Sequence, residues 1–253
     1  MANQYFVFQA MPAVGENFEL TDAAAVHHIF TVLRAKAGDS LRLVFDDGKV
    51  GRASVVKANE HLLELTEILS VETELPVAVT IAVGLPKGDK LDFIAEKATE
   101  LGAAAIWAAP FDWSVSKYDA KKRAKKYEKL TKIVQNAAEQ SLRQMIPEIA
   151  LFENFHQLTE KFVDFDAVLI AYEETAKAGD VSSFAKNLSP ISKGQKILMI
   201  FGPEGGISPA EIDAMLGLGA ATIGLGPRIL RAETAPLVGL SQIAAYYELF
   251  GKV

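Results

Sequence analysis

A glycine-rich segment at residues 201–209, FGPEGGISP, has the residue types of a ligand-binding loop. Three glycines within five positions allow a backbone to approach a ligand closely or to adopt positive φ angles. The segment matches neither GxGxxG nor GxxxxGK[ST], so it does not support a phosphate-cradling loop of either kind. For such a turn taken alone, a tight connection that binds nothing is the alternative.

A second segment of this kind, LGPRILRAETAP, follows at residues 225–236. Two arginines and a glutamate, Arg228, Arg231 and Glu233, crowd its glycine-proline turn. A salt-bridged surface turn is the alternative interpretation. However, both segments follow apolar runs typical of buried strands, and open α/β sheets bind ligands at the carboxyl ends of their strands. Two such loops on successive strands therefore predict a ligand pocket.

Basic residues are concentrated in the stretch 117–132. It holds 8 of the chain's 26 lysines and arginines against two acidic residues. On a helix, Lys121, Lys122 and Lys125 would share one side with further lysines, so the helix would offer a basic stripe to a polyanion. A solvated helix face is the alternative, and it is the commoner outcome for a single lysine-rich helix.

The elements that must position these residues fall into two groups. Residues 1–72 are predicted to form a β-rich unit with one helix at 23–33, and from about residue 74 strands alternate with helices, as in a largely parallel sheet with crossover helices. Ser208, Pro209 and Glu211 form a capping box with proline in its preferred place, which predicts a helix from 209. The expected strands are 5–9, 40–45, 50–57, 61–68, 77–83, 104–108, 167–172, 196–201 and 221–225. The expected helices are 89–101, 120–143, 181–187, 209–216 and 235–250.

Composition excludes several classes of protein. The chain has 253 residues, a net charge of -6 and no cysteine, which removes disulfides, thiolate metal sites and cysteine nucleophiles. Its four histidines lack metal-site spacing, so no metal is expected. With no signal-peptide pattern and no apolar run near the ~18 residues of a membrane span, a cytoplasmic protein without membrane contact is expected. The negative total averages over the basic stretch, so it does not argue against a nucleic-acid partner.

Six ordered motifs identify a family resemblance. FGPEGGIS followed by LGPRILRAETA resembles the C-terminal motifs of the SPOUT methyltransferases. Four more motifs resemble those of one SPOUT family, the small-subunit ribosomal RNA methyltransferase E family of 16S rRNA uridine-N3 methyltransferases. These four are HIFTVLR at 28–34, FDDG at 45–48, KATELG at 97–102, and AEQSLR at 138–143 with IPEI at 146–149.

The resemblance implies an α/β protein of two domains. Residues 1–73 would form a PUA-like β-barrel that binds RNA, and residues 74–253 a SPOUT-type α/β domain with a C-terminal trefoil knot. It also implies S-adenosylmethionine (SAM) as methyl donor, a uridine of 16S rRNA in the small ribosomal subunit as substrate, and a homodimer. Topological rules alone would count against a threaded chain, so the knot rests on the resemblance.

On this basis the site residues can be assigned roles. Arg231 is expected to stabilise the charge that develops as uracil N3 loses its proton, and Glu233 to act as general base or to orient Arg231, with Glu204 as the rival base. The expected cofactor-binding residues are Gly202, Glu204, Gly205, Gly206, Leu225, Gly226, Ile229, Leu230 and Thr234. The expected RNA-binding residues are Arg34, Lys121, Lys122, Lys125, Gln140, Arg143 and Arg228.

Two positions depart from the family pattern. Gln4 stands where many members carry an arginine, and Trp113 stands where an arginine usually precedes a Ser-Val pair. If those arginines hold RNA phosphates, this chain must hold RNA differently, for instance by stacking Trp113 on a base. The competing interpretations are a SPOUT ribose 2′-O methyltransferase, a non-catalytic ribosome-assembly protein that binds RNA, and a nucleotide-binding enzyme of the doubly wound type.

Overall fold

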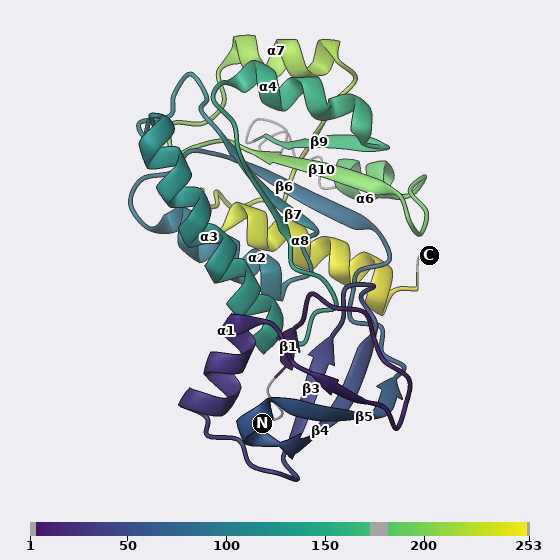
Figure 1. The fold of residues 1–253 in the computed structure, drawn as a ribbon. Coiled ribbons are helices and arrows are strands. Elements are labelled where there is room, and N and C mark those ends of the chain that lie inside the picture. Colours follow the sequence, from purple (N-terminus) through teal and green to yellow (C-terminus); the bar gives the residue numbers. More distant parts are fainter. Residues whose placement is uncertain (1–3, 173–181, 252–253) are drawn as a thin grey trace. The chain divides into compact units, whose positions relative to one another are not determined.

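A computed structural model describes residues 4–172 and 182–251, which separate into two compact units (Figure 1). The N-terminal unit runs as far as Glu74 and also contains Ala138–Met145. The C-terminal unit contains Leu75–Ala137 and the chain from Ile146 onward. Because 138–145 returns to the first unit, the chain crosses between the units more than once.

The N-terminal unit is built on a five-stranded sheet of order β1-β3-β4-β5-β2. Strands β1 and β3 are parallel, and the other neighbours are antiparallel. The Asp22 side chain accepts a hydrogen bond from the Ala25 N–H and so caps helix α1, which continues as a π-helical turn at His27–Val32. The bounds are β1 Gln4–Phe6, β2 Asn17–Glu19, α1 Ala23–Val26, β3 Ser40–Val44, β4 Val50–Lys57 and β5 Leu62–Leu69.

The C-terminal unit contains a six-stranded, all-parallel sheet of order β11-β9-β10-β6-β7-β8. Its central strands are buried on both faces, as their continuous apolar runs predict. The strands are β6 Ala78–Gly84, β7 Ala105–Ala109, β8 Glu148–Leu151, β9 Ala167–Ala171, β10 Lys196–Phe201 and β11 Ala221–Ile223. The helices are α2 Lys90–Glu100, α3 Ala120–Gln140, α4 Phe155–Thr159, α6 Ser182–Leu188, α7 Pro209–Gly217 and α8 Ala235–Ala244.

Helices cover both faces of this sheet. Figure 1 shows α4 and α7 on one face and α2, α3 and α8 on the other. Two apolar clusters match these layers: Leu91, Leu130 and Leu240 belong to one, and Leu158 and Ile212 to the other. The predicted α/β domain with a parallel sheet and the preceding β-rich unit are therefore confirmed, whereas the trefoil knot stays a prediction.

Several elements differ from the sequence prediction. Strand β2 was missed because its three residues contain one apolar side chain, and β8 because four residues at a sheet edge give too short a pattern. Helix α3 ends at Gln140 and not at 143, because Leu142 adopts a left-handed φ of 61° and the Arg143 N–H closes the helix on the Ala138 carbonyl at 2.9 Å. Of the helix predicted at 181–187, Val181 lies outside the described residues.

Candidate active site

Three neighbouring strands deliver the predicted loops to one edge of the C-terminal sheet. Strands β9, β10 and β11 are adjacent and parallel, so their carboxyl ends, Ala171, Phe201 and Ile223, lie at the same edge. The loops that follow β10 and β11 form a cavity of about 660 Å³ there. That volume lies within the roughly 300–1,000 Å³ that small-molecule sites occupy. The sheet thus brings the two glycine-proline loops together as predicted.

The first loop is fixed by the start of helix α7. The Ser208 side chain accepts from the Glu211 N–H, and the Glu211 carboxylate accepts from the Ser208 N–H at 2.9 Å, so the predicted capping box is present. The Gly206 N–H donates to the Pro203 carbonyl at 2.9 Å, and Gly206 has a φ of +85°, a conformation that side chains disfavour. The resulting tight turn carries Glu204 at its tip.

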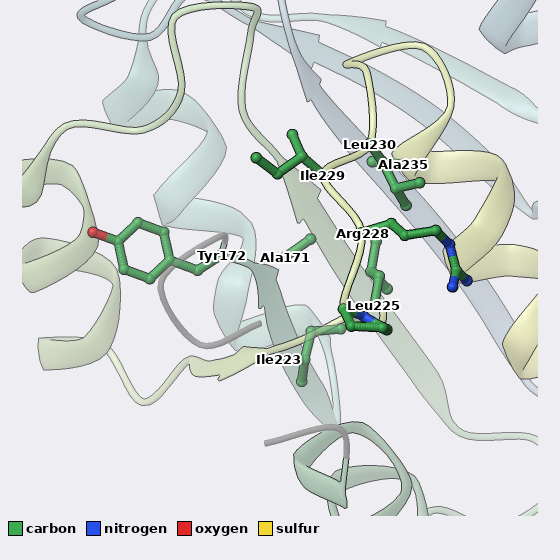
Figure 2. A pocket seen from close by; sticks show the side chains of 10 residues that line it. Ala171, Tyr172, Ile223, Leu225, Arg228, Ile229, Leu230 and Ala235 are labelled. Atoms are coloured by element: carbon green, nitrogen blue, oxygen red, sulfur yellow. The ribbon is translucent and has the colours of Figure 1, made fainter. Parts of the chain in front are cut away.

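The second loop forms an apolar pocket of its own (Figure 2). Its wall includes Ile223, Leu225, Gly226 and Ile229, and in Figure 2 the Arg228 guanidinium and the Tyr172 ring lie on opposite sides of the view. Gln242 on α8 donates to the Leu225 carbonyl at 3.2 Å and so fixes the start of the loop. Gly226 has a φ of +120°, which only glycine adopts without strain.

A lysine that was not predicted joins the two loops. The Lys90 ammonium, at the start of α2, lies 3.0 Å from a carboxylate oxygen of Glu204 and 3.0 Å from one of Glu233. All three side chains are partly buried, so solvent screens these two ion pairs less than it screens fully exposed ion pairs. The only sequence signal for Lys90 is its position just after the carboxyl end of β6, at the same edge of the sheet.

The Lys90 bridge changes the acidity of both candidate bases. Hydrogen bonds to Glu204 and Glu233 raise the pKa of Lys90. Desolvation works to raise the pKa of Glu204, but hydrogen bonds from Lys90 and from backbone N–H groups outweigh it, so the pKa of Glu204 is lowered. The pKa of Glu233 is lowered by its own backbone N–H and then by Lys90. Both carboxylates are therefore held ionised and are weak bases.

The other predicted cofactor and catalytic residues take different positions. Arg231 lines the larger cavity, and its side chain makes no ion pair or hydrogen bond with any residue in the described ranges. Its carbonyl accepts from the N–H groups of Thr234 and Ala235, which start helix α8. Thr234 is the N-cap of that helix and is not part of either cavity wall. Of the other predicted cofactor residues, the larger cavity is lined by Gly202, Glu204, Gly205, Gly206, Ile229 and Leu230. The smaller pocket shares Ile229 and Leu230 and also contains Leu225 and Gly226.

Arg143, predicted to bind RNA, is buried inside the N-terminal unit. It is 2% exposed, and its guanidinium pairs bidentately with Glu74, with Nε 2.9 Å and 3.0 Å from the two carboxylate oxygens. The Gln4 amide donates to the Arg143 carbonyl at 2.6 Å and accepts from Arg42 Nε at 2.7 Å. The predicted RNA-binding role is therefore corrected, because a buried and paired guanidinium cannot reach a phosphate. Through its pair with Glu74, Arg143 instead holds residues 138–145 in the N-terminal unit.

This pair gives a stability prediction. Arg143→Met should lower the free energy of unfolding by about 3 kcal/mol, because the partly buried Glu74 carboxylate loses its bidentate partner. Arg52→Met is the matched control, since the Arg52–Glu67 pair at 2.9 Å is exposed on both sides and should contribute less than about 1 kcal/mol. Urea unfolding followed by circular dichroism measures both, and equal losses would contradict the structural role of Arg143.

The basic stretch on α3 divides into paired and exposed lysines. Lys126 and Lys129 lie 2.7 Å and 2.8 Å from the carboxylate of Asp92, which is 8% exposed, so they tie α3 to α2. The predicted RNA ligands Lys121, Lys122 and Lys125 are exposed, and the Lys122 ammonium lies 4.6 Å from the centre of the Tyr118 ring. Gln140, Arg228 and Arg34 are also exposed, and Arg34 has a left-handed φ of 56°.

Two properties of the described residues bear on other functions. Within 4–172 and 182–251, no three or more His, Asp or Glu side chains are grouped so that they could hold a metal ion. Across the same ranges, every helix is too short or too polar to cross a membrane.

Comparison with known proteins relates this chain to RNA methyltransferases. A family model of the RNA methyltransferase domain matches residues 73–244, and a model of the RNA methyltransferase PUA domain matches residues 20–68. The chain is 41% identical over 250 residues to ribosomal RNA small subunit methyltransferase E of Bacillus subtilis, covering 97% of both chains.

Two solved structures of similar chains contain a bound cofactor. The putative methyltransferase of Legionella pneumophila in complex with SAM is 28% identical, with a TM-score of 0.81 over 97% of this chain and 98% of the other. A ribosomal RNA small subunit methyltransferase E from Neisseria gonorrhoeae bound to SAM is 25% identical, with a TM-score of 0.80 over the same shares. Two proteins that are similar to this chain over nearly its full length therefore bind SAM.

Proposed function

The chain belongs to the ribosomal RNA small subunit methyltransferase E family, and we propose that it methylates N3 of one uridine in 16S ribosomal RNA with SAM as donor. The observation that carries this proposal is the cavity between the two glycine-proline loops, where Lys90 bridges the carboxylates of Glu204 and Glu233 and Arg231 lines the wall. That charge pattern suits a reaction in which an acceptor nitrogen must lose a proton.

The residues around the cavity fit the donor. The smaller pocket has the apolar lining that an adenosine requires, and the φ of Gly226 lets the backbone itself form part of the wall. Backbone groups of Gly202, Gly205 and Leu230 in the two loops would hold the methionine and ribose parts. Bound SAM supplies an electrophilic methyl group whose sulfur leaves as a neutral thioether, so the chain needs no acid for the leaving group.

The acceptor side is where the chain's own residues act. Uracil N3 carries a proton between two carbonyls. Because both carboxylates at the cavity are weak bases, this proton passes to solvent water, and the imide charge that remains must be stabilised. Arg231 is placed for this, because it lines the cavity and its guanidinium makes no ion pair or hydrogen bond with a described residue, while the Glu233 carboxylate attracts it. Glu233 has too low a pKa for an efficient general base, so we assign it the orientation of Arg231 and Lys90.

RNA binding is assigned to surfaces of both units. Lys121, Lys122 and Lys125 would contact phosphates, and Arg34, Gln140 and Arg228 are further exposed candidates. We assign residues 1–73 to RNA docking and residues 74–253 to methyl transfer, in line with the two matched family models. A homodimer acting in the cytoplasm on the small ribosomal subunit completes the proposal.

Primer extension tests the modification directly. Methylation at N3 blocks the Watson–Crick edge of uracil, so reverse transcriptase should stop at one position in small-subunit rRNA from cells that carry the gene. Cells without the gene should lose this stop and regain it when the gene is restored. An identical stop pattern with and without the gene would refute the proposal, and a stop only at low nucleotide concentration would indicate ribose 2′-O methylation.

A further inference from the structure

Trp113 is a half-exposed aromatic residue at the larger cavity. It lies in the loop after β7 and shares the cavity wall with Lys90 and Arg231. Trp113 is 48% exposed, whereas the chain's other tryptophan, Trp107, is 7% exposed and packs edge-on against aromatic rings. A large apolar ring left half in water beside a binding cavity indicates a contact surface for a ligand rather than core packing.

The glycine turn supports Trp113 from one side. A Cβ atom on Gly205 would lie 2.9 Å from both the Cβ and the carbonyl oxygen of Trp113, so glycine is required there to admit the tryptophan. A Cβ atom on Gly206 would lie 3.7 Å from the six-membered part of the indole. The ring is therefore held against the first loop, and the exposed part of its surface is free to contact a ligand.

Hydrogen bonds fix the residues on both sides of Trp113. The Ser208 hydroxyl donates to the Asp112 carboxylate at 2.7 Å, and the Asp112 N–H donates to the Glu211 carboxylate at 2.8 Å. The Ser114 hydroxyl accepts from the Phe111 N–H at 2.9 Å. Ser208 and Glu211 are buried members of the capping box that shapes the first loop. The tryptophan is therefore pre-positioned, which lowers the entropy cost of binding through it.

We infer that the exposed face of Trp113 stacks on the uracil that receives the methyl group and holds it beside Arg231. This inference deepens the proposed function and rests on it. A base must leave its stack in RNA to reach an enclosed donor, and an aromatic side chain replaces the lost stacking. The apolar pocket formed by the second loop does not include Trp113, so the adenosine of the donor has a separate surface available.

Tryptophan fluorescence tests the contact without turnover. The wild-type protein is titrated first with S-adenosylhomocysteine and then with small-subunit rRNA from cells that lack the gene. RNA should quench the emission of the wild-type protein but not that of Trp113→Phe, in which only buried Trp107 still emits. S-adenosylhomocysteine alone should leave the emission unchanged. Quenching by S-adenosylhomocysteine alone, or no quenching by RNA, would overturn the inference.

The kinetics of two variants show whether Trp113 acts by stacking on the base or only by its apolar volume. Trp113→Leu keeps an apolar side chain but has no planar ring, and kcat/KM for RNA should fall about tenfold. Trp113→Phe keeps a ring and should retain most of kcat/KM for RNA, and KM for SAM should stay unchanged in both variants. Equal losses in the two variants, or a rise confined to KM for SAM, would contradict stacking on the acceptor. If the wild-type protein methylates no rRNA, the proposed function fails, and the fluorescence titration still decides whether Trp113 stacks on RNA.

Discussion

Arg231→Ala should lower kcat by about 10³ and leave the affinity for SAM nearly unchanged, because the lost interaction exists only while the acceptor carries negative charge. The guanidinium lines the larger cavity and makes no ion pair or hydrogen bond in the described parts of the chain, so its N–H groups are available to a ligand. Its backbone is held by the turn into α8, and removal of the side chain should not move the second loop. Single-turnover methyl transfer measures the rate, and calorimetry measures the affinity for SAM.

Arg231→Lys is the matched variant for this experiment. It keeps the positive charge but replaces the planar guanidinium by a point charge, so it should retain more activity than alanine and less than the wild-type protein. This order would show that both charge and geometry matter. If Arg231→Ala instead loses affinity for SAM, Arg231 belongs to the donor pocket, and the assignment to the acceptor would be wrong.

The positions of the two loops could be predicted from sequence because local signals determine them. Ser208, Pro209 and Glu211 set the helix start within four residues, and the apolar runs before each loop identify buried strands. A parallel sheet then brings the carboxyl ends of neighbouring strands to one edge. The helix start and the strands depend on short-range patterns, and the general rule for parallel sheets supplies the shared edge.

Lys90 and Arg143 could not be assigned from sequence, because tertiary contacts decide their roles. Lys90 meets Glu204 and Glu233 only after β6, β10 and β11 have joined one sheet. Arg143 follows a lysine-rich helix in the sequence, but residues 138–145 belong to the N-terminal unit, where Arg143 pairs with Glu74. Burial and pairing, which a linear pattern does not contain, separate a structural arginine from one that binds phosphate.

Because Lys90 lies between Glu204 and Glu233, the protonation states of these two candidate bases are coupled. The Lys90 ammonium lies 3.0 Å from both carboxylates, so a change in the charge of one carboxylate alters the pKa of the other. Since the pKa values of Glu204 and Glu233 are both lowered, the cluster carries two negative charges and one positive charge at neutral pH, with Arg231 close by. The positive charge of Arg231 then brings the net charge of the cluster to zero. The attraction between Arg231 and Glu233 supports the role of Glu233 in orienting Arg231.

Lys90→Met should therefore lower kcat by about 10² and shift its pH dependence. In the wild-type protein, Glu204 and Glu233 have lowered pKa values, so they stay charged as pH falls and lose that charge only below the usual range of a glutamate. Without the ammonium, their hydrogen-bonded partner is lost and the two carboxylates repel each other, so both pKa values rise. Protonation then begins at higher pH, and the acid limb of the kcat profile should move upward.

Lys87→Met is the matched control, because it removes the same charge three residues before Lys90 in the sequence. Lys87 is exposed and contacts Glu204 only through its backbone N–H, at 3.2 Å, which the substitution retains. Its pH profile should coincide with that of the wild-type protein, whereas the acid limb of Lys90→Met moves. The profiles are measured from about pH 3.5 to 9, so that they include the acid limb, and with saturating SAM and RNA, since kcat then reports groups in the bound complex. If the acid limb of Lys90→Met stays in place while kcat falls, Lys90 stabilises the loops without controlling the charge of the carboxylates.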